Sequence, residues 1–457
     1  MAKTATKDMT VGSPLKLILG FAIPTLLGML FQQFYSMVDT MIVGKWLGVD
    51  SLAAVGSTGS INFMVVGFCI GVCSGFAIPV AQKFGAGDYK ALRRFVTNSV
   101  WISAIFAVIM TVLVSIFCMD ILRLMKTPEN IIDEAYSYIF IIFIGIPVTY
   151  LYNLLSGIIR SLGDSKTPVY FLVISSILNI ILDIMSIGVF HMGVAGPALA
   201  TVISQAISGV LCLLYMKKHF EILHMEKDEW RWDWHYVKIL CGMGIPMGLQ
   251  YSITAIGSVV LQTAVNSLGS TAVASVTAGV KVSMFFCCPF DALGGTMATY
   301  AGQNVGAKRL DRINKGLWSA TVIGSVYSIA ACLILSFFGK TIALLFMDAS
   351  EVEILNSVQL YLRFNTAFYI PLALVNIVRF AIQGMGFSTF AIFAGVCEMV
   401  ARMIIAFIFV PIFGFVAVCA ANPLAWIMAD IFLIPAYLYC IKKLNRWFDG
   451  TDKKSLA

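Results

Sequence analysis

Charged residues are scarce in this chain of 457 residues. Asp, Glu, Lys and Arg together make up 12% of the sequence, whereas a soluble globular domain usually carries roughly 25%. This scarcity excludes an ordinary soluble domain. The hydrophobic share of 59% also excludes intrinsic disorder, which requires few apolar residues and a high charge. The composition indicates an integral membrane protein.

The motifs of metal sites and enzymes are also missing from the sequence. It has 4 histidines, and its 11 cysteines are scattered without a repeated Cys-x-x-Cys or Cys-x-x-His spacing. An enzyme would need a nucleophile–base pair, a metal cluster or a phosphate-binding loop, and none stands out. We therefore predict that the protein is not an enzyme and uses no cofactor. The net charge of +7 does not indicate nucleic acid binding, because the basic residues lie in short loops between apolar runs.

Long apolar runs fill most of the chain. A membrane-spanning helix requires about 20 mostly apolar residues. Polar breaks divide the sequence into twelve such runs: 15–44, 52–80, 92–118, 132–158, 168–190, 194–216, 236–265, 272–300, 314–338, 353–381, 388–411 and 415–441. The sequence therefore predicts an all-α integral membrane fold of twelve transmembrane helices.

The distribution of Lys and Arg predicts the orientation in the membrane. With the N-terminus inside, the inner segments hold 23 of these residues and the outer segments hold 4. By the positive-inside rule both termini are cytoplasmic. The polar N-terminal segment shows no signal-peptide cleavage pattern. We expect a multi-pass protein of the inner (plasma) membrane.

The second half of the chain repeats the first. Landmarks such as Ile23-Pro24 and Ile245-Pro246 recur at an offset that stays between 221 and 224 residues. Each repeat holds six spans, so the two repeats are parallel, and transporters built in this way bind substrate between their halves. The predicted parts are an N-terminal lobe (1–218), a cytoplasmic linker (219–235), a C-terminal lobe (236–441) and a cytoplasmic tail (442–457). The internal two-fold makes a monomer sufficient.

The first and fifth spans carry acidic residues at a similar depth. Asp39 and Asp183 both lie in the outer half of a span that runs from inside to outside. Tyr35 precedes Asp39 by four residues and Asn179 precedes Asp183 by four, so each pair shares a helix face. Thr201 lies in the outer half of the sixth span. These five polar side chains are predicted to meet in the N-terminal half.

The predicted cluster suits a cation. An ionisable group inside a span costs about 2.5–3.5 kcal/mol on insertion scales, so it usually has a role or a partner. The oxygens of Asp39, Asn179 and Asp183 suit a hard cation such as sodium. They suit a proton equally, because burial and a second carboxylate both favour the protonated form of an acid. The sequence leaves the choice open, and each acid taken alone could instead brace a helix.

The second half lacks this set of acids. Asp39 aligns near Val260, and Asp183 aligns near Ile404 to Ala406. Glu398 and Arg402 are four residues apart and can pair on one helix face, whereas Arg379 and Asp430 are expected to be structural. The candidates for a substrate cavity are Gln33, Asn153, Gln250, Asp291, Glu398 and Arg402.

Several segments resemble the multidrug and toxic compound extrusion (MATE) family, and are most similar to its bacterial DinF-type and MepA-type branches. They are "AIPTLLGMLFQQFYSMVDTMIVGKWLG", "GQNVGAKRLDRINKG", "RSLGDSKTP", "LNIILDIMSIGVFHMGVAGPALAT" and "NPLAW". The resemblance covers about residues 14–441. It implies two six-helix, pseudo-symmetric lobes around a central cleft, and antiport of an organic cation against protons or sodium ions.

The resemblance also assigns roles to individual residues. The DinF-type cation site uses an aspartate in helix 1, an Asn-x-x-x-Asp pair in helix 5 and a threonine in helix 6. Asp39, Asn179, Asp183 and Thr201 match these positions, and Tyr35 matches a tyrosine one turn before the first aspartate. Other branches use acids in helices 7, 8 or 10, of which this sequence has only Asp291 in helix 8.

Two alternatives to drug export remain within the same superfamily. One is a flippase for lipid-linked sugars, although such proteins often have fourteen spans and a strongly basic cavity. The other is a narrow-specificity metabolite exporter. A channel is less compatible with the repeat, because a channel pore is more naturally built from oligomeric symmetry or a filter loop. The expected partners are small, organic and cationic substrates together with membrane lipids, and not nucleic acid.

Overall fold

The computed structural model describes residues 6–125, 127–345 and 351–450, and every regular element in these ranges is helical. Ten helices are long and apolar enough to cross a membrane, and two bent helix pairs raise the number to as many as twelve. The predicted all-α fold with twelve spans is confirmed.

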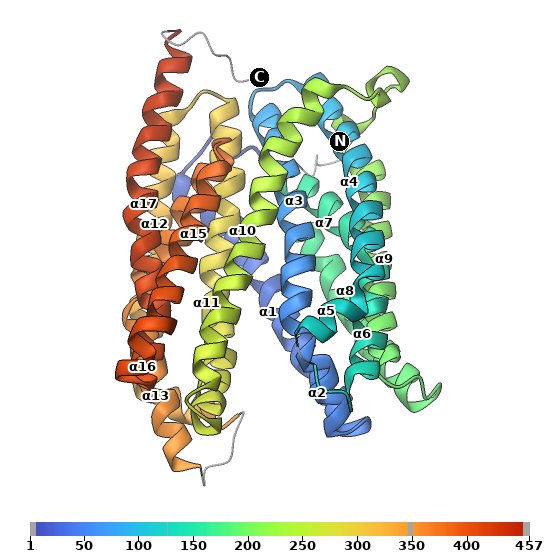
Figure 1. Cartoon of the computed structure of the whole chain (residues 1–457). Helices are drawn as coiled ribbons and strands as arrows, with labels where there is room; N and C mark the ends of the chain where they lie inside the picture. The colour runs from blue at the N-terminus through green and yellow to red at the C-terminus, as the bar shows by residue number, and fades with distance from the viewer. Residues whose placement is uncertain (1–5, 126, 346–350, 451–457) are drawn as a thin grey trace. The chain divides into compact units, whose positions relative to one another are not determined.

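The first repeat forms nine α-helices and is followed by two short 3-10 helices (Figure 1). They are α1 (Pro14–Trp46), α2 (Val49–Ser57), α3 (Gly59–Gly85), α4 (Tyr89–Ile116), α5 (Cys118–Leu124), α6 (Ile132–Ile144), α7 (Ile146–Ser161), α8 (Lys166–Gly188), α9 (Ala195–His219), η1 (Glu221–Leu223) and η2 (Lys227–Trp230).

The second repeat follows the same order, with one π-helical turn in its fifth span. Its elements are α10 (Trp234–Asn266), α11 (Ser270–Gly306), α12 (Leu310–Ala343), α13 (Val352–Ala367), α14 (Tyr369–Gly384), α15 (Thr389–Ile404), η3 (Ile405–Phe409), α16 (Val410–Phe413) and α17 (Phe415–Phe448).

The fourth span of each repeat is broken at an equivalent place. Helices α6 and α7 meet at an angle of 46°, and α13 and α14 meet at 50°. Pro147 and Pro371 lie in the first turn of the second helix of each pair. A proline has no backbone N–H with which to bond the preceding turn, so the chain bends where the helix would otherwise continue.

The internal repeat is present in the backbone as well as in the sequence. Three pairs of glycines related by the repeat have matching positive φ angles: Gly48 (93°) and Gly269 (96°), Gly163 (89°) and Gly386 (95°), Gly193 (59°) and Gly414 (57°). Glycine adopts such angles without steric cost, unlike residues that carry a Cβ. These glycines therefore fix equivalent turns between equivalent helices.

The contacts divide the chain into two compact units. Unit 1 comprises Met1–Asp8 and Leu27–Gly248, and unit 2 comprises Met9–Leu26 and Leu249–Ala457. The division differs from the predicted ranges because it falls inside two helices, α1 and α10, rather than in loops. In both helices the chain passes from one unit to the other two residues after a proline, Pro24 or Pro246.

Within unit 1 the predicted linker is packed against α4. Arg93 bonds both carboxylate oxygens of Glu229 at 2.9 and 2.7 Å, and Glu229 is 1% exposed. The Thr97 hydroxyl and the Trp101 indole N–H donate to backbone oxygens of η2. Burial by itself would raise the pKa of the Glu229 carboxyl, but hydrogen bonds from Arg93 and the Glu226 backbone N–H outweigh it and hold that pKa below its usual value.

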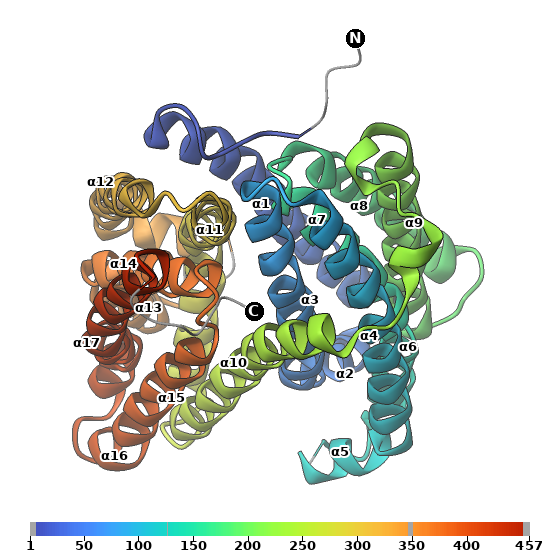
Figure 2. The same cartoon turned by 90° about the horizontal axis from the view of Figure 1, so that it is seen from above.

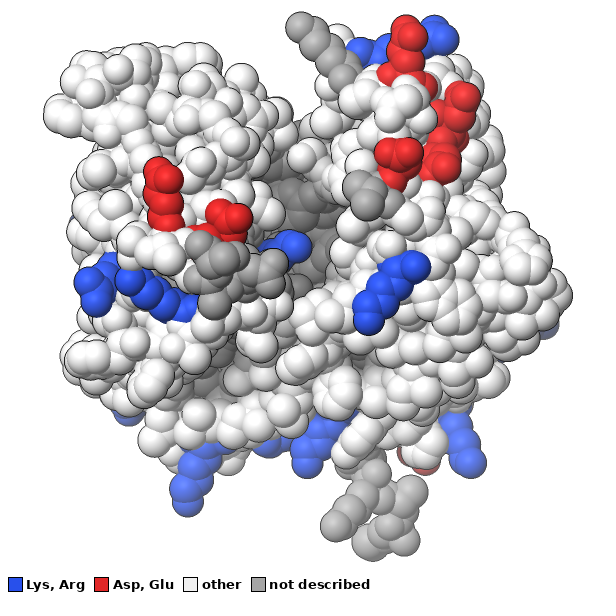
Figure 3. All heavy atoms as spheres, turned by 90° about the horizontal axis from the view of Figure 1, so that it is seen from below, with Lys and Arg blue, Asp and Glu red and all other residues white. Residues whose placement is uncertain are grey.

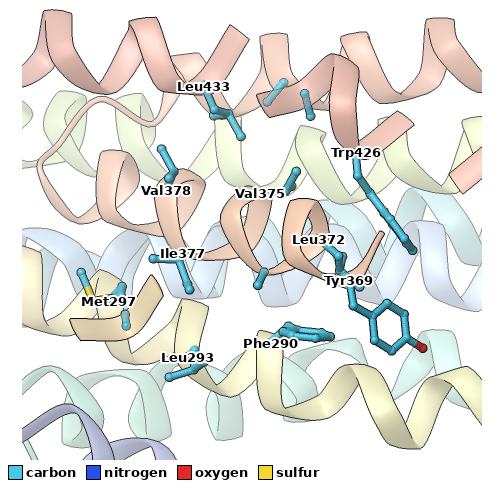
Figure 4. Close-up of a cluster of buried hydrophobic side chains, with 14 of the residues drawn as sticks. Phe290, Leu293, Met297, Tyr369, Leu372, Val375, Ile377, Val378, Trp426 and Leu433 are labelled. Carbon is cyan, nitrogen blue, oxygen red and sulfur yellow. The ribbon is translucent and has the colours of Figure 1, made fainter. Parts of the chain in front are cut away.

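The core of unit 2 is built by α11, α14 and α17 (Figure 4). Phe290 on α11 and Tyr369 on α14 meet edge to face with ring centroids 5.3 Å apart, and Trp426 on α17 joins them. Aromatic pairs prefer this geometry. In unit 1 the corresponding helix pairs α3–α7 and α8–α9 pack together (Figure 2). In a membrane such packing, rather than release of water, holds helices together.

Candidate functional site

The five residues of the predicted cation site come together in unit 1. Tyr35 and Asp39 lie on α1, Asn179 and Asp183 on α8, and Thr201 on α9. The carboxyl groups of Asp39 and Asp183 lie within hydrogen-bonding reach of each other, and the Tyr35 side chain lies within reach of Thr201. Three helices thus supply one polar cluster inside apolar segments.

Asn179 connects α8 to α9. When its amide nitrogen faces Asp183, it donates to Asp183 Oδ2 at 3.1 Å, and its amide oxygen accepts from the Thr201 backbone N–H at 3.1 Å. The Thr201 hydroxyl lies 3.4 Å from the same amide group. The first bond follows from the four-residue spacing on one helix face. The second sets the register of α8 against α9.

Two carboxylate oxygens in the cluster have no hydrogen-bond partner among the described residues. They are Oδ1 of Asp39 and Oδ1 of Asp183, and both atoms are buried. Asp183 is 0% exposed and Asp39 is half-buried. Buried polar atoms are normally paired, since an unpaired one costs free energy. Two adjacent carboxylates also repel each other unless a proton or a metal ion lies between them.

A fourth helix contributes a residue that we did not predict. Tyr138 on α6 is buried and lies close enough to interact electrostatically with Asp39, Asp183 and Tyr35. Its spacing from the other residues carried no signal, because spacing along one helix does not give the rotation of another. The repeat offset could have drawn attention to it, since Tyr361 occupies the related position in unit 2.

A second buried polar cluster lies in unit 2. Glu398 and Arg402 pair on α15 as predicted, with Arg402 Nη2 and Glu398 Oε2 3.5 Å apart. Arg379 on α14, which we expected only to brace helices, also forms an ion pair with Glu398. All three side chains are at most 8% exposed. Glu398 therefore lies between two arginines rather than beside one.

The remaining cavity candidates are distributed over both units. In unit 1, Asn153 donates to the Thr149 carbonyl of its own helix at 2.8 Å, and Gln33 is half-buried on α1. In unit 2, Gln250 accepts from Gln383 at 2.6 Å, and Asp291 is exposed on α11. Neither unit by itself groups these residues into one site, so their role in binding substrate stays a prediction.

No group of three or more His, Cys, Asp or Glu side chains in the described ranges could hold a metal ion. Sodium binding in unit 1 would therefore depend on two carboxylates completed by neutral oxygens, those of Asn179 and Thr201. A proton would need only the two carboxyl groups. The same geometry is compatible with either ion.

Comparison with known proteins places the chain in a family. A sequence model of the MatE family matches residues 24–185 and 246–408. The chain is 32% identical to the probable multidrug resistance protein YoeA of Bacillus subtilis (strain 168), over 72% of this chain and 73% of that protein. It is 31% identical to the probable multidrug resistance protein YpnP of the same strain, over 81% of this chain and 82% of that one.

A solved structure shows the same fold. The outward-facing conformation of a multidrug resistance MATE family transporter of the MOP superfamily matches with a TM-score of 0.90 and 22% identity, over 98% of this chain and 100% of that one. The two matched segments of the family model begin at the repeat-related prolines, Pro24 and Pro246. The chain therefore belongs to the MatE family of multidrug efflux transporters.

Proposed function

We propose that the protein is a secondary active antiporter that exports organic cations in exchange for protons or sodium ions. The observation that carries this proposal is the Asp39–Asp183 pair, with its two unpartnered buried oxygens. A proton or sodium ion bound between the carboxyl groups would relieve their repulsion and satisfy these oxygens. The cation-free cluster is thus a site whose charge changes on loading.

Coupling requires that the cation binds two conformations with different affinity. Helix α1 is suited to link the two, because it carries Tyr35 and Asp39 in unit 1 while its first half belongs to unit 2. Pro24 removes one backbone hydrogen bond just before the chain changes unit, which permits bending there. Loading of the cation would change the contacts of α1 in unit 1 and so favour release of the drug.

We also propose that the protein acts as a monomer in the inner membrane with both termini in the cytoplasm. The excess of Lys and Arg in one set of loops supports this orientation. Figure 3 views the molecule from below Figure 1, the side on which α2 of unit 1 lies, and this face carries acidic side chains in separate groups. Such a face is compatible with the outer surface.

Transport of a fluorescent cationic dye in proteoliposomes tests the proposal. A pH gradient and a sodium gradient are imposed separately on wild type, on Asp39→Asn and on Asp120→Asn, an exposed acid on α5 that serves as the matched control. We expect one gradient to drive dye movement in wild type and in the control but not in Asp39→Asn. Equal, gradient-driven transport in Asp39→Asn would remove the coupling site from the account.

If neither gradient moves the dye in wild type, the substrate is not a dye-like organic cation. That result would favour a flippase for lipid-linked sugars or a narrow-specificity metabolite exporter.

A further inference from the structure

The repeat relates the cation site of unit 1 to a set of positions in unit 2. The glycine turns that precede α8 and α15, and those that precede α9 and α17, fix the register of these helices at offsets of 223 and 221 residues. The same offsets place Arg402 where unit 1 has Asn179, and Asn422 where it has Thr201. Unit 2 thus carries a guanidinium at the position of the cation-binding amide.

The acids of unit 1 have no counterpart at these positions. The offset of 222 residues that relates Pro24 to Pro246 places Leu261 at the position of Asp39, and the offset of 223 places Ala406 at that of Asp183. Unit 2 has therefore lost both carboxylates and gained a positive charge. A cluster so changed has no place for an exchangeable cation.

Arg402 lies among the elements that correspond to the cation site. Its Nε donates to Asn422 Oδ1 at 3.3 Å, and Asn422 Nδ2 in turn donates to Tyr361 Oη at 3.2 Å. Its Cδ lies 3.6 Å from the point that a Cβ on Gly257 would occupy. Gly257 is the counterpart of Tyr35 at the offset of 222, so the arginine stem fills space that a tyrosine takes in unit 1.

The partner charge also comes from this cluster. Glu398 precedes Arg402 by one helical turn and accepts from its Nη2 at 3.5 Å. Arg402 is 6% exposed, and its Nη1 has no partner among the described residues. Arg379 shares Glu398, so the three side chains carry one net positive charge. A guanidinium keeps its proton in a protein, and this charge is therefore permanent.

We propose that Arg402 is a tethered cation. Its guanidinium takes, in unit 2, the position that the exchangeable proton or sodium ion takes in unit 1. Unit 2 therefore stays permanently loaded, and only unit 1 exchanges a cation during transport. The inference rests on the proposed function, since it identifies which of the two related positions is free to couple.

Chemical rescue tests this role. Arg402→Ala removes the guanidinium and leaves space lined by Glu398 and Asn422. Methylguanidinium supplies the lost cation, whereas methylurea has nearly the same shape and N–H donors but no charge. The purified full-length variant is heated with each compound, and Arg363→Ala, which removes an exposed arginine of α13, is the matched control.

We expect methylguanidinium to raise the unfolding temperature of Arg402→Ala by roughly 2–4 °C and to restore part of its dye transport. Methylurea should do neither, and Arg363→Ala should respond to neither compound. Equal rescue by methylurea would mean that Arg402 only fills space. A response to methylguanidinium no larger than that of the control would also overturn the proposal.

A second pair of variants keeps the test decisive if Arg402→Ala does not fold. Arg402→Lys retains a cation and should keep at least half of the wild-type transport, whereas the uncharged Arg402→Met should lose most of it. Wild-type transport by Arg402→Met would reject the tethered cation. The response of Arg402→Ala should persist when Asp39→Asn is added, so a failure of the unit 1 coupling site would be seen separately, in the transport of Asp39→Asn alone.

Discussion

Replacing Asp183 by asparagine changes the charge of the unit 1 cluster without changing its shape. The wild-type side chain is 0% exposed, with Oδ2 bonded to Asn179 and Oδ1 without a partner. An amide at this position can donate a hydrogen bond to Asp39. The repulsion between two carboxylates is then replaced by a permanent bond that no cation needs to bridge.

The expected magnitudes follow from this exchange. A hydrogen bond to a charged group contributes about 1.5–3 kcal/mol, so cation-free Asp183→Asn should be more stable than the cation-free wild type. Removing one partner of a buried charge pair costs about 2–5 kcal/mol, so cation affinity should fall by roughly 30-fold or more. The variant should therefore be stable but inactive in transport.

Thermal unfolding in lipid nanodiscs measures both effects. The unfolding temperature of the wild type should rise on addition of the coupling cation, while that of Asp183→Asn should start higher and stay constant. Asp120→Asn should behave as the wild type. If Asp183→Asn is less stable than the wild type without cation and still responds to it fully, the carboxyl pair is not the cation site.

Three further predictions concern other parts of unit 1. Tyr138→Phe keeps the ring but removes the hydroxyl near the carboxyl pair, so it should change the cation concentration for half-maximal transport by roughly 5-fold, whereas Tyr136→Phe on the same helix should not. Because the pKa of Glu229 is held below its usual value, its ionised form stabilises the linker above about pH 4.3, and the deficit in unfolding temperature of Glu229→Gln at pH 7 should shrink as the pH falls below that value. Gly163→Ala places a Cβ at a φ of 89° and should cost about 1–2 kcal/mol or more in unfolding free energy, while Gly56→Ala, whose Cβ would meet nothing within 4 Å, should be nearly neutral.

The membrane spans could be predicted from the sequence because length and apolarity alone define them. The cation cluster could be predicted because depth in the membrane adds a coordinate that a soluble sequence lacks. Asp39 and Asp183 could be assigned to one depth, and four-residue spacing then placed Tyr35 and Asn179 beside them. The repeat supported this assignment, because a constant offset does not arise by chance in apolar sequence.

Other features could not be predicted because they depend on how the helices rotate and pack. Tyr138 joins the cluster through the rotation of α6, and Arg379 joins Glu398 through the packing of α14 on α15. The passage of α1 from one unit to the other also depends on tertiary contacts. No local pattern in an apolar helix records which neighbours its two halves will contact.

Competition between cation and substrate on the purified protein tests antiport most directly. The dissociation constant of a fluorescent cationic dye is measured at rising proton or sodium concentration, for wild type and for Asp39→Asn. Because linkage between two binding sites is reciprocal, the account predicts that the coupling cation weakens dye binding to the wild type. In Asp39→Asn the dye affinity should be independent of that cation. An equal, cation-dependent loss of dye affinity in both proteins would contradict coupling through the unit 1 carboxyl pair.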